Sequence, residues 1–241
     1  MASDVDLGRL AEGYRHRPPS DASLARARLA GSELAPGSMI LDVGGGPGHH
    51  AAVWSEQRHL PIVLDSASEM TRPARNRSIV VVHGLSQALP FGDERFDLAW
   101  FHLSIHYGDW RAALNEALRV TKQNGRIEIW TLAADNHATS LLAQWFPAVV
   151  EIDRARFPAG ADVEAHLAGH GATVHRSHEI EQRTRTVGEW ITAVEAGFVS
   201  TLQFVSDGEL AAGLAGFRRA YPDPSANIAY EMRFDRVVAR R

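Results

Sequence analysis

The chain contains no cysteine in its 241 residues. This absence excludes disulfide bonds, thiolate nucleophiles and sulfur-ligated metal sites, and it is compatible with a reducing compartment. The chain also lacks an excess of basic residues, because 25 Lys and Arg stand against 29 Asp and Glu. Proteins that bind a phosphate backbone usually carry a basic stripe. We therefore expect no nucleic-acid partner.

Long apolar runs are missing as well. The N-terminal stretch MASDVDLGRLAEGYRHRPPS has none, and no later stretch approaches the roughly 18 apolar residues of a membrane span. The chain also has no internal repeat and no low-complexity block. We expect a single domain over residues 1–241 in the cytoplasm, without a membrane partner, as a monomer or a homodimer.

Apolar runs typical of strands alternate with helical patterns at the spacing of βαβ units. The first five predicted strands are Met39 to Val43, Pro61 to Asp65, Ile79 to Val82, Phe96 to Phe101 and Gly125 to Leu132. Before the fifth, apolar residues from Trp110 to Leu118 recur at helical spacing, Asp109 can cap their start, and Asn124-Gly125 supplies the turn out. This order predicts an α/β fold with a doubly wound, mainly parallel sheet.

The chain after Leu132 predicts two more strands, at Ala172 to Ile180 and Asn227 to Ala239, for seven in all. Helical patterns cover residues 140–150, 162–167, 187–204 and 208–219, so a helical insertion precedes the last strand. Residues 1–35 include a weakly amphipathic run, 21–34, and are expected to form an N-terminal helical cap over a ligand cleft. Residues 36–132 would then form the ligand-binding core, and residues 133–241 the substrate side and the final strands.

The first predicted strand leads into a glycine-rich loop, in the run Met39-Ile-Leu-Asp-Val-Gly-Gly-Gly-Pro-Gly-His-His. Glycine lets the backbone approach a ligand that side chains would keep away. A dinucleotide-binding loop would have Gly or Ala at position 49, where this chain has His49, so the spacing argues against NAD. Asp65 ends the second strand, where an acidic side chain can accept hydrogen bonds from ribose hydroxyls.

Asp42, Gly44, Gly46 and Gly48 reproduce the pattern Asp-x-Gly-x-Gly-x-Gly, and the run resembles that of the class I S-adenosylmethionine (SAM)-dependent methyltransferases. Residues 83–91 and 96–102 resemble more narrowly the type 11, ubiquinone-biosynthesis-like branch. The resemblance covers about residues 10–132, and more faintly the tail. It implies a Rossmann-like fold, SAM as the cofactor and S-adenosylhomocysteine as the product.

The resemblance also implies a set of cofactor-binding residues along the chain. They are Tyr14, Asp42, Gly44, Gly45, Gly46, Gly48, Asp65, Ser66, Met70, Gly84, Leu85, Ser86, Phe101 and His102. In many such folds the acid at Asp42 lies below the ligand and orders the amides of the glycine loop. The family often has an acid at Leu85 that binds adenine, so adenine would here rely on backbone groups, on Ser86 or Gln87, or on apolar contact.

Two histidines follow the fourth strand, near the position that the resemblance gives to the transferable methyl group. His106 is the candidate general base, and His102 is a weaker one. Methyl transfer from a sulfonium mainly needs placement, and it needs a base only where the acceptor must lose a proton. Packing around the cleft is therefore the alternative role, and the one we favour for both.

Other polar groups have simpler interpretations. His49 and His50 could meet the SAM carboxylate or lie on the solvated surface. His166 and His170 share a helical spacing, but no nearby carboxylate completes a metal set, so we expect no metal. Tyr14 and the basic residues after it resemble a segment that caps the SAM site, or they form a polar tail. Most of the later aromatic residues, such as Trp145 and Phe198, should be core, with a few facing the ligand.

The sequence thus favours a SAM-dependent methyltransferase that acts on an oxygen, nitrogen or carbon atom of a small molecule. Two alternatives remain open at this point. One is a SAM-binding protein without methyl transfer, either a binding module or an enzyme of another reaction. The other is a tRNA methyltransferase, against which the acidic balance of the chain weighs.

Overall fold

The computed structural model describes residues 5–17, 28 and 34–241. Its contacts divide the chain into two compact units. The core unit comprises Pro19–Thr131, Pro158–Ser177 and Asp235–Arg241. The accessory unit comprises Met1–Pro18, Leu132–Phe157 and His178–Phe234. The predicted helical run of residues 21–34 lies outside the described residues, apart from Arg28 and Leu34. The single-domain organisation, with its cap, core and substrate side, stays a prediction.

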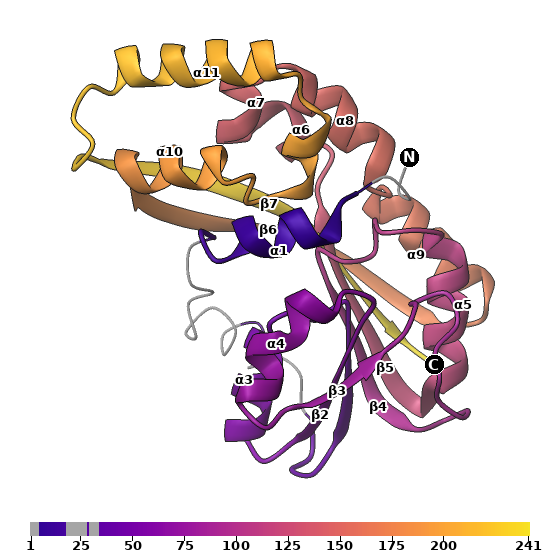
Figure 1. Ribbon diagram of the computed structural model, residues 1–241. Helices are drawn as coiled ribbons and strands as arrows, with labels where there is room; N and C mark the ends of the chain where they lie inside the picture. The colour runs from indigo at the N-terminus through magenta and orange to yellow at the C-terminus, as the bar shows by residue number, and fades with distance from the viewer. Residues whose placement is uncertain (1–4, 18–27, 29–33) are drawn as a thin grey trace. The chain divides into compact units, whose positions relative to one another are not determined.

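One sheet of seven strands runs through the described residues, in the order β3-β2-β1-β4-β5-β7-β6 (Figure 1). The strands are β1 (Met39–Val43), β2 (Leu60–Asp65), β3 (Val80–His83), β4 (Phe96–His102), β5 (Thr121–Leu132), β6 (Thr173–Thr186) and β7 (Asn227–Arg240). β1 pairs in parallel with β2 and β4, β2 with β3, and β4 with β5. The predicted α/β fold with a mostly parallel seven-stranded sheet is confirmed, although β6 continues to Thr186 instead of ending at Ile180.

β7 runs antiparallel to β5. The N–H of Asn124, early in β5, donates to the carbonyl of Arg241, whereas the N–H of Ala133, just after β5, donates to the carbonyl of Arg233. Residue numbers therefore rise along one strand and fall along the other. The start of β5 differs from the prediction, because Asn124 has a left-handed φ of 64° inside the strand and not in a turn before it. The additional residues are absorbed as a bulge where the pairing with β4 shifts register.

The strand order creates a switch point between β1 and β4. The chain moves outward from β1 to β2 and β3, and it then returns to the other side of β1 for β4. In parallel sheets, the loops that leave the carboxyl ends of two such strands diverge and leave room for a ligand. Here these loops are residues 44–48 after β1 and residues 103–109 after β4.

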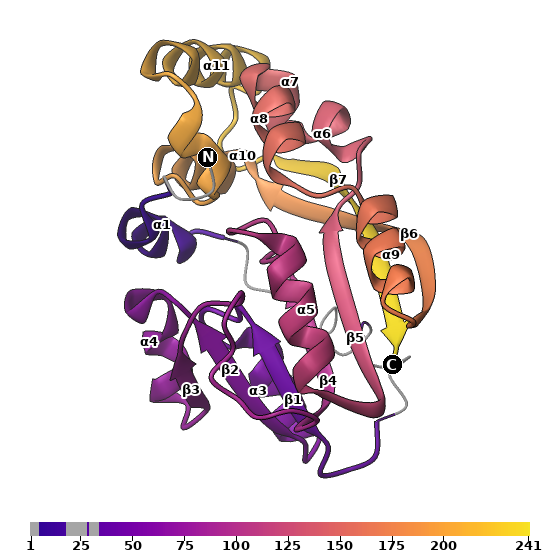
Figure 2. The ribbon, with the colours of Figure 1, turned by 90° about the vertical axis from the view of Figure 1, so that its right-hand side faces the viewer.

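The two faces of the core sheet are covered by different helices. α5 (Trp110–Val120) and α9 (Gly160–Gly169) pack on alternate apolar residues of the strands and share one buried cluster with them. Asp109 caps α5 as predicted, by accepting hydrogen bonds from the N–H groups of the first turn. α3 (His49–Glu56) and α4 (Ser68–Asn76) lie on the opposite side of the strands (Figure 1). Figure 2 shows α5 and α9 from their outer side.

The accessory unit is built mainly from helices. They are α1 (Leu7–Tyr14), α6 (Asn136–Thr139), α7 (Leu141–Trp145), α8 (Ala148–Arg156), α10 (Val187–Glu195), the 3-10 helix η2 (Ser200–Phe204) and α11 (Asp207–Ala220). Two predicted helices are each divided, at Pro147 and at Gly197, because proline lacks a donor N–H and Gly197 has a φ of 65°. The core of this unit contains a stack of Trp190 on Phe217, with ring centroids 3.8 Å apart.

None of the helices within the described residues is long and apolar enough to cross a membrane.

Candidate functional site

The glycine loop follows β1 in a backbone conformation that side chains rarely adopt. Gly44, Gly46 and Gly48 have φ values of 67°, 48° and 71°. The N–H of Gly44 donates to the carbonyl of Leu64 at 2.7 Å, and the N–H of Gly46 donates to Oδ2 of Asp65 at 3.0 Å. The loop is therefore fixed against the end of β2, and its left-handed turns explain why glycine recurs at alternate positions.

The four loop glycines are required for different reasons. A Cβ on Gly44 would lie 2.5 Å from the Cβ of Ser104, and one on Gly45 would lie 2.5 Å from the carboxyl carbon of Asp42. A Cβ on Gly48 would lie 2.9 Å from that of Ala74 on α4. These three glycines let protein pack against protein.

Gly46 differs from its neighbours. The nearest atoms to a Cβ placed there would be Cε of Met70 at 3.3 Å and Oδ2 of Asp65 at 3.9 Å. No backbone of the described residues closes this space, so the bare surface of Gly46 lies between the thioether of Met70 and the carboxylate of Asp65. Among the predicted loop residues, Gly46 is the one whose missing side chain leaves an approach for a ligand.

Asp65 is half-buried at the end of β2, with both carboxylate oxygens in use. Oδ2 accepts the N–H of Gly46, and Oδ1 accepts the N–H of Ala67 at 2.8 Å. Burial raises the pKa of Asp65, and the hydrogen bonds from these backbone groups oppose that shift. Each carboxylate oxygen keeps a second lone pair. The side chain is thus held at the carboxyl edge of the sheet and can still accept hydrogen bonds from a ligand.

Asp42 lies beneath the loop and is 1% exposed. Burial raises the pKa of Asp42 to about 8, and the charge of Asp65 adds to the shift. The carboxyl group is therefore neutral near pH 7. The loop amides donate to Leu64, Asp65 and Gly45 instead, so Asp42 supports the loop by contact with Gly45 and not by ordering its amides.

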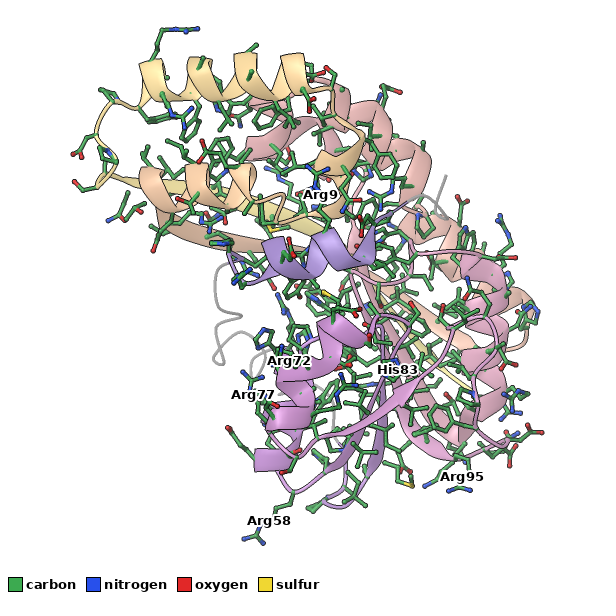
Figure 3. All side chains as sticks on the ribbon, viewed as in Figure 1. Arg9, Arg58, Arg72, Arg77, His83 and Arg95 are labelled. Carbon is green, nitrogen blue, oxygen red and sulfur yellow. The ribbon has the colours of Figure 1, made fainter. Side chains whose placement is uncertain are left out.

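The segment after β3 presents an apolar surface at the same edge of the sheet. His83, labelled in Figure 3, ends β3, and the N–H of Gly84 donates to the carbonyl of Asp65 at 3.3 Å. Leu85 is 59% exposed, although it is a large apolar residue. The Ser86 hydroxyl donates to the side chain of Gln87. An exposed leucine beside a polar edge suits an aromatic ligand face, which fits the apolar alternative for adenine. Ser66 is exposed on the preceding turn.

The loop after β4 closes the other side of the switch point. Leu103 has a φ of 53°, which costs energy for a residue with a Cβ, and its N–H donates to the carbonyl of Trp130 at 2.9 Å. The Ser104 hydroxyl donates to the carbonyl of Val43 at 2.6 Å. Neither Leu103 nor Ser104 was predicted from the sequence as a residue of the site. No sequence signal marks a non-glycine residue at positive φ, because the surrounding contacts impose it.

The predicted residues of this loop differ in how they are placed. Phe101 is fully buried in the apolar cluster under α5 and α9, so its side chain offers no ligand surface. His102 is half-buried, and its ring lies 4.7 Å from that of His50. His106 is 4% exposed, and its ring centroid lies 4.1 Å from that of Tyr107. Burial of this kind fits a packing role for His106 better than a freely accessible base.

His50 does not lie on the solvated surface, so that interpretation was wrong for this residue, and its contact with the SAM carboxylate stays a prediction. It is 8% exposed, and its ring packs 5.5 Å from that of Trp100. Nη1 of Arg28 lies 3.2 Å from its Nε2. Burial lowers the pKa of His50 to about 3, and the nearby positive charges of Arg28 and His49 act in the same direction. The ring is a neutral part of the core.

A buried ion network on this face was also missed by the sequence analysis. Glu128 on β5 is fully buried and lies 2.9 Å from Arg126, and Nε of Arg236 on β7 donates to it at 2.7 Å. Nε1 of Trp130 donates to the same carboxylate at 3.0 Å. The signal was present, because residues 126 and 128 are the charged residues of the stretch Gly125 to Leu132 and, being two apart, share one face of the strand.

Tyr14 belongs to α1 of the accessory unit, where the guanidinium carbon of Arg17 lies 4.2 Å from its ring centroid. His166 and His170 are ring neighbours, but His166 bonds Asn115 and His170 bonds the carbonyl of His166. In the described part of the chain, no group of three or more acidic, histidine or cysteine side chains could hold a metal ion.

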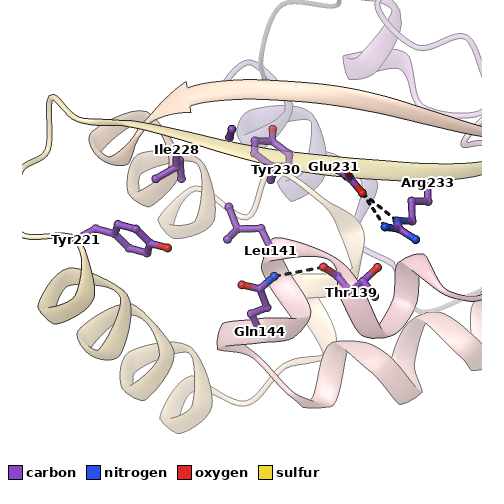
Figure 4. A pocket seen from close by; sticks show the side chains of 9 residues that line it. Thr139, Leu141, Gln144, Tyr221, Ile228, Tyr230, Glu231 and Arg233 are labelled. Atoms are coloured by element: carbon purple, nitrogen blue, oxygen red, sulfur yellow. Dashed lines mark hydrogen bonds and ion pairs between the residues drawn. The ribbon is translucent and has the colours of Figure 1, made fainter.

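A pocket of about 250 Å³ lies within the accessory unit (Figure 4). Its lining comes from α6, α7, the end of α11 and β7, and it includes none of the predicted SAM-binding residues. Arg233 at its rim is paired with both Glu231 and Asp135. This cation is therefore already neutralised by the protein, and the glycine loop remains the candidate site.

Comparison with known proteins gives concordant matches. The family described as "Methyltransferase domain" matches residues 41–129. The malonyl-[acyl-carrier protein] O-methyltransferase of Erwinia billingiae is 34% identical over 191 residues, which cover 76% of this chain and 71% of that protein.

Solved structures share the fold at low identity. The YcgJ protein of Bacillus subtilis has a TM-score of 0.63 at 18% identity, over 90% of this chain and 97% of that chain. Phosphoethanolamine N-methyltransferase 2 of Haemonchus contortus, solved in complex with S-adenosyl-L-methionine, has a TM-score of 0.62 at 15% identity, over 98% of this chain and 57% of that chain.

Proposed function

Because this chain belongs to the class I SAM-dependent methyltransferases, in the type 11 branch, we propose that it transfers the methyl group of SAM to an oxygen atom of a small molecule. The observation that carries the proposal is the bare surface of Gly46 between Met70 and Asp65. The comparisons do not favour either of the two alternatives, which are a SAM-binding protein without methyl transfer and a tRNA methyltransferase.

The residues at the carboxyl edge fit the parts of SAM. The open approach at Gly46 suits a chain of ligand atoms that runs along the backbone. Asp65 has acceptor capacity left for the ribose hydroxyls, and exposed Leu85 offers an apolar surface for adenine. Bound SAM would supply a methyl group activated by a sulfonium. The remaining predicted contacts stay predictions, since Phe101 could contribute only backbone atoms.

The chain's own residues would act by placement. The hydrogen bonds of Gly44, Gly46 and Ser104 hold the loops after β1 and β4 at fixed positions before a ligand arrives. Pre-organisation of this kind lowers the entropy that is lost on bringing two reactants together. His106 is buried beside Tyr107, and in this proposal it shapes the acceptor side of the cleft.

The choice of an oxygen acceptor rests on the name of the relative, which methylates an oxygen of a malonyl group carried by a protein. We propose a small acid as the acceptor, with a carrier-bound acid as the second candidate. A radiolabelled methyl assay with the free acid and with the carrier-bound acid separates the two. The product of an oxygen acceptor would be an ester or an ether.

The cofactor assignment is tested by thermal melting of the full chain with SAM, S-adenosylhomocysteine or NADPH. A ligand that binds only the folded state raises the melting temperature by mass action. We expect a shift with both adenosyl ligands and none with NADPH. The absence of any shift at millimolar SAM would overturn the assignment. Formation of S-adenosylhomocysteine in the presence of acceptor then distinguishes transfer from binding alone.

A further inference from the structure

Arg185 in β6 is a buried cation of the accessory unit that the proposed mechanism does not use. It is 6% exposed. Nη2 donates to the carbonyl of His16 at 2.9 Å, and the guanidinium carbon lies 5.6 Å from the ring centroid of Phe198. The side chain is thus held in place by neutral groups, including the hydroxyl of Tyr230, to which it is hydrogen-bonded.

Nε and Nη1 of Arg185 have no hydrogen-bond partner among the described residues, and no described carboxylate forms an ion pair with it. Two groups favour its charged form: the Tyr230 hydroxyl, which is also hydrogen-bonded to Arg185, and the carboxylate of Glu189, which accepts the N–H of Thr186 in a capping box. A buried charge without a partner costs several kcal/mol in general, so such groups are normally paired. The N–H groups of Arg185 that bond no described residue could donate charge-assisted hydrogen bonds to a bound anion.

Other arginines with little exposure bond acidic or hydroxyl side chains of the protein itself. Arg126 pairs with Glu128, and Arg183, two residues before Arg185 on the same face of β6, pairs with Glu181. Arg156 donates to the hydroxyls of Ser200 and Thr201. Arg185 therefore differs from Arg126 and Arg183 in pairing with no described carboxylate.

The surroundings of Arg185 add a second cation. Nε of Arg17 donates to the carbonyl of Phe198 at 2.9 Å, and Arg185 bonds the carbonyl of His16, the residue before Arg17. Gly13 of α1 packs directly against the carbonyl of Ala196, after α10, so this part of the accessory unit is closely joined (Figure 1). Two guanidinium groups thus approach the same residue, Phe198.

A hydroxyl group completes the set. Tyr230 on β7 lies beside Arg185 and Arg183, whose positive charges favour its ionised form. Its burial has the larger effect, and it raises the pKa of the Tyr230 hydroxyl, which remains a neutral donor. A guanidinium with free N–H groups, a second guanidinium and a phenol are donors that a carboxylate accepts well.

We propose that Arg185, assisted by Arg17 and Tyr230, binds the carboxylate of a small acid within the accessory unit. The proposal goes beyond the methyltransferase function proposed above. The site provides binding energy and orientation, so Arg185 is a specificity residue and takes no part in a bond-making step. Its loss should weaken the binding of a small acid and leave the binding of S-adenosylhomocysteine unchanged.

The test measures binding of malonate and glutarate to the full chain saturated with S-adenosylhomocysteine, by calorimetry, with inorganic phosphate as a comparison. Arg185→Met should weaken carboxylate binding about 10-fold or more, as expected for loss of a charge-assisted hydrogen bond, and leave the affinity for S-adenosylhomocysteine unchanged. The matched control is Arg154→Met, an exposed arginine of α8 that pairs with Glu151. Arg185→Lys keeps the charge but loses the planar donors, so its affinity for carboxylates should lie between those of the parent and of Arg185→Met.

Stability separates this role from a structural one. If Arg185 binds an anion and has no structural role, its replacement by Met removes a buried charge that no carboxylate of the described residues pairs. The melting temperature of this variant without ligand should then equal or exceed that of the parent. A large fall in the Met and Lys variants alike would overturn the proposal, as would carboxylate binding that is equal in Arg185→Met and the parent. Binding of phosphate but of neither carboxylate would also overturn it. S-Adenosylhomocysteine affinity, measured alongside, reports separately on the proposed cofactor function.

Discussion

Two regions of the molecule assemble polar groups in different ways. We call them the glycine edge, which is the loop of residues 44–48 with Asp65 in the core unit, and the Arg185 cluster, which is Arg185 with Arg17 and Tyr230 in the accessory unit. At the glycine edge, a loop amide meets a carboxylate only 19 positions along the chain, from Gly46 to Asp65. In the Arg185 cluster, the joined groups are 169 positions apart for Arg185 and His16, and 181 for Arg17 and Phe198. The first is a local motif, and the second exists only after the chain has folded.

The difference explains why a cofactor site can be predicted from the sequence more easily than the site of a small acid. A cofactor shared by a whole family is bound mainly through backbone conformation, which glycines encode at fixed spacing. The small acid proposed for the Arg185 cluster is recognised by side chains from distant segments, which carry no common spacing. Ligand binding at the glycine edge should therefore be sensitive to side chains that fill the space beside the backbone. Ligand binding at the Arg185 cluster should be sensitive to the loss of charge.

The largest effect is expected from Gly46→Val. Its branched side chain would fill the space between Met70 and Asp65 and would resist the φ of 48°. We expect loss of measurable SAM binding by calorimetry. Gly92→Val is the matched control, because a Cβ at Gly92 meets no atom within 4 Å and its φ is not left-handed. A folded Gly46→Val protein that still binds SAM would remove the distinction between the two regions.

Asp65→Ala should weaken SAM binding by about 1 to 3 kcal/mol, since ligand hydroxyls and the Gly46 N–H would both lose an acceptor. The dissociation constant reports this change, and thermal melting checks that the chain remains folded. Glu69→Gln is the control, an exposed acid on the neighbouring helix α4. Equal affinities in Asp65→Ala and the parent would assign the ribose contact to another residue.

Asp42→Asn tests whether the buried acid beneath the glycine loop makes the free energy of unfolding depend on pH. The folded-state pKa of Asp42, about 8, is above its unfolded value of 3.8, so stability is lost as pH rises between them. His50, with its pKa lowered to about 3, is neutral in the folded state, but in the unfolded state it still binds a proton near its ordinary pKa of 6.5, and this opposes the slope from Asp42. Between pH 7 and 8, where unfolded His50 is mostly neutral, the free energy of unfolding of the parent should fall by on the order of 1 kcal/mol per pH unit because of Asp42.

Denaturant titrations at several pH values measure this slope. Asp42→Asn should flatten it, and Asp162→Asn, an exposed acid on α9, should leave it unchanged. A slope that persists in Asp42→Asn would mean that another group titrates in this window.

The smallest effect is expected from His106→Gln. If the buried ring only shapes the pocket, the Michaelis constant should change more than turnover, and the pH profile should match that of the parent. Steady-state kinetics over a range of pH measure both quantities. A fall in turnover of about 100-fold with loss of the rise near pH 6 to 7 would identify His106 as a general base.

Much of the core could be predicted because its signals are local. The bounds of β1, the start of β4, the cap Asp109 and the acid at Asp65 were all visible as short patterns. The start of β5 was not, because Asn124 and Gly125 are typical turn residues and only the pairing with β4 and the bonds to Arg241 keep them in the strand. The burial of His50 was likewise not visible, since its sequence position beside a loop does not reveal the Trp100 ring that packs against it.

The sequence by itself determined the βαβ order, the alternate glycines and the acids that follow β1 and β2, because strand period, positive φ and strand ends are properties of adjacent residues. Only the tertiary structure decided which glycine leaves an open approach, that Asp42 is neutral, and that Arg185 is buried without a carboxylate among the described residues. These properties depend on which atoms from distant segments fill or leave the space around a group, and that space does not exist until the chain has folded.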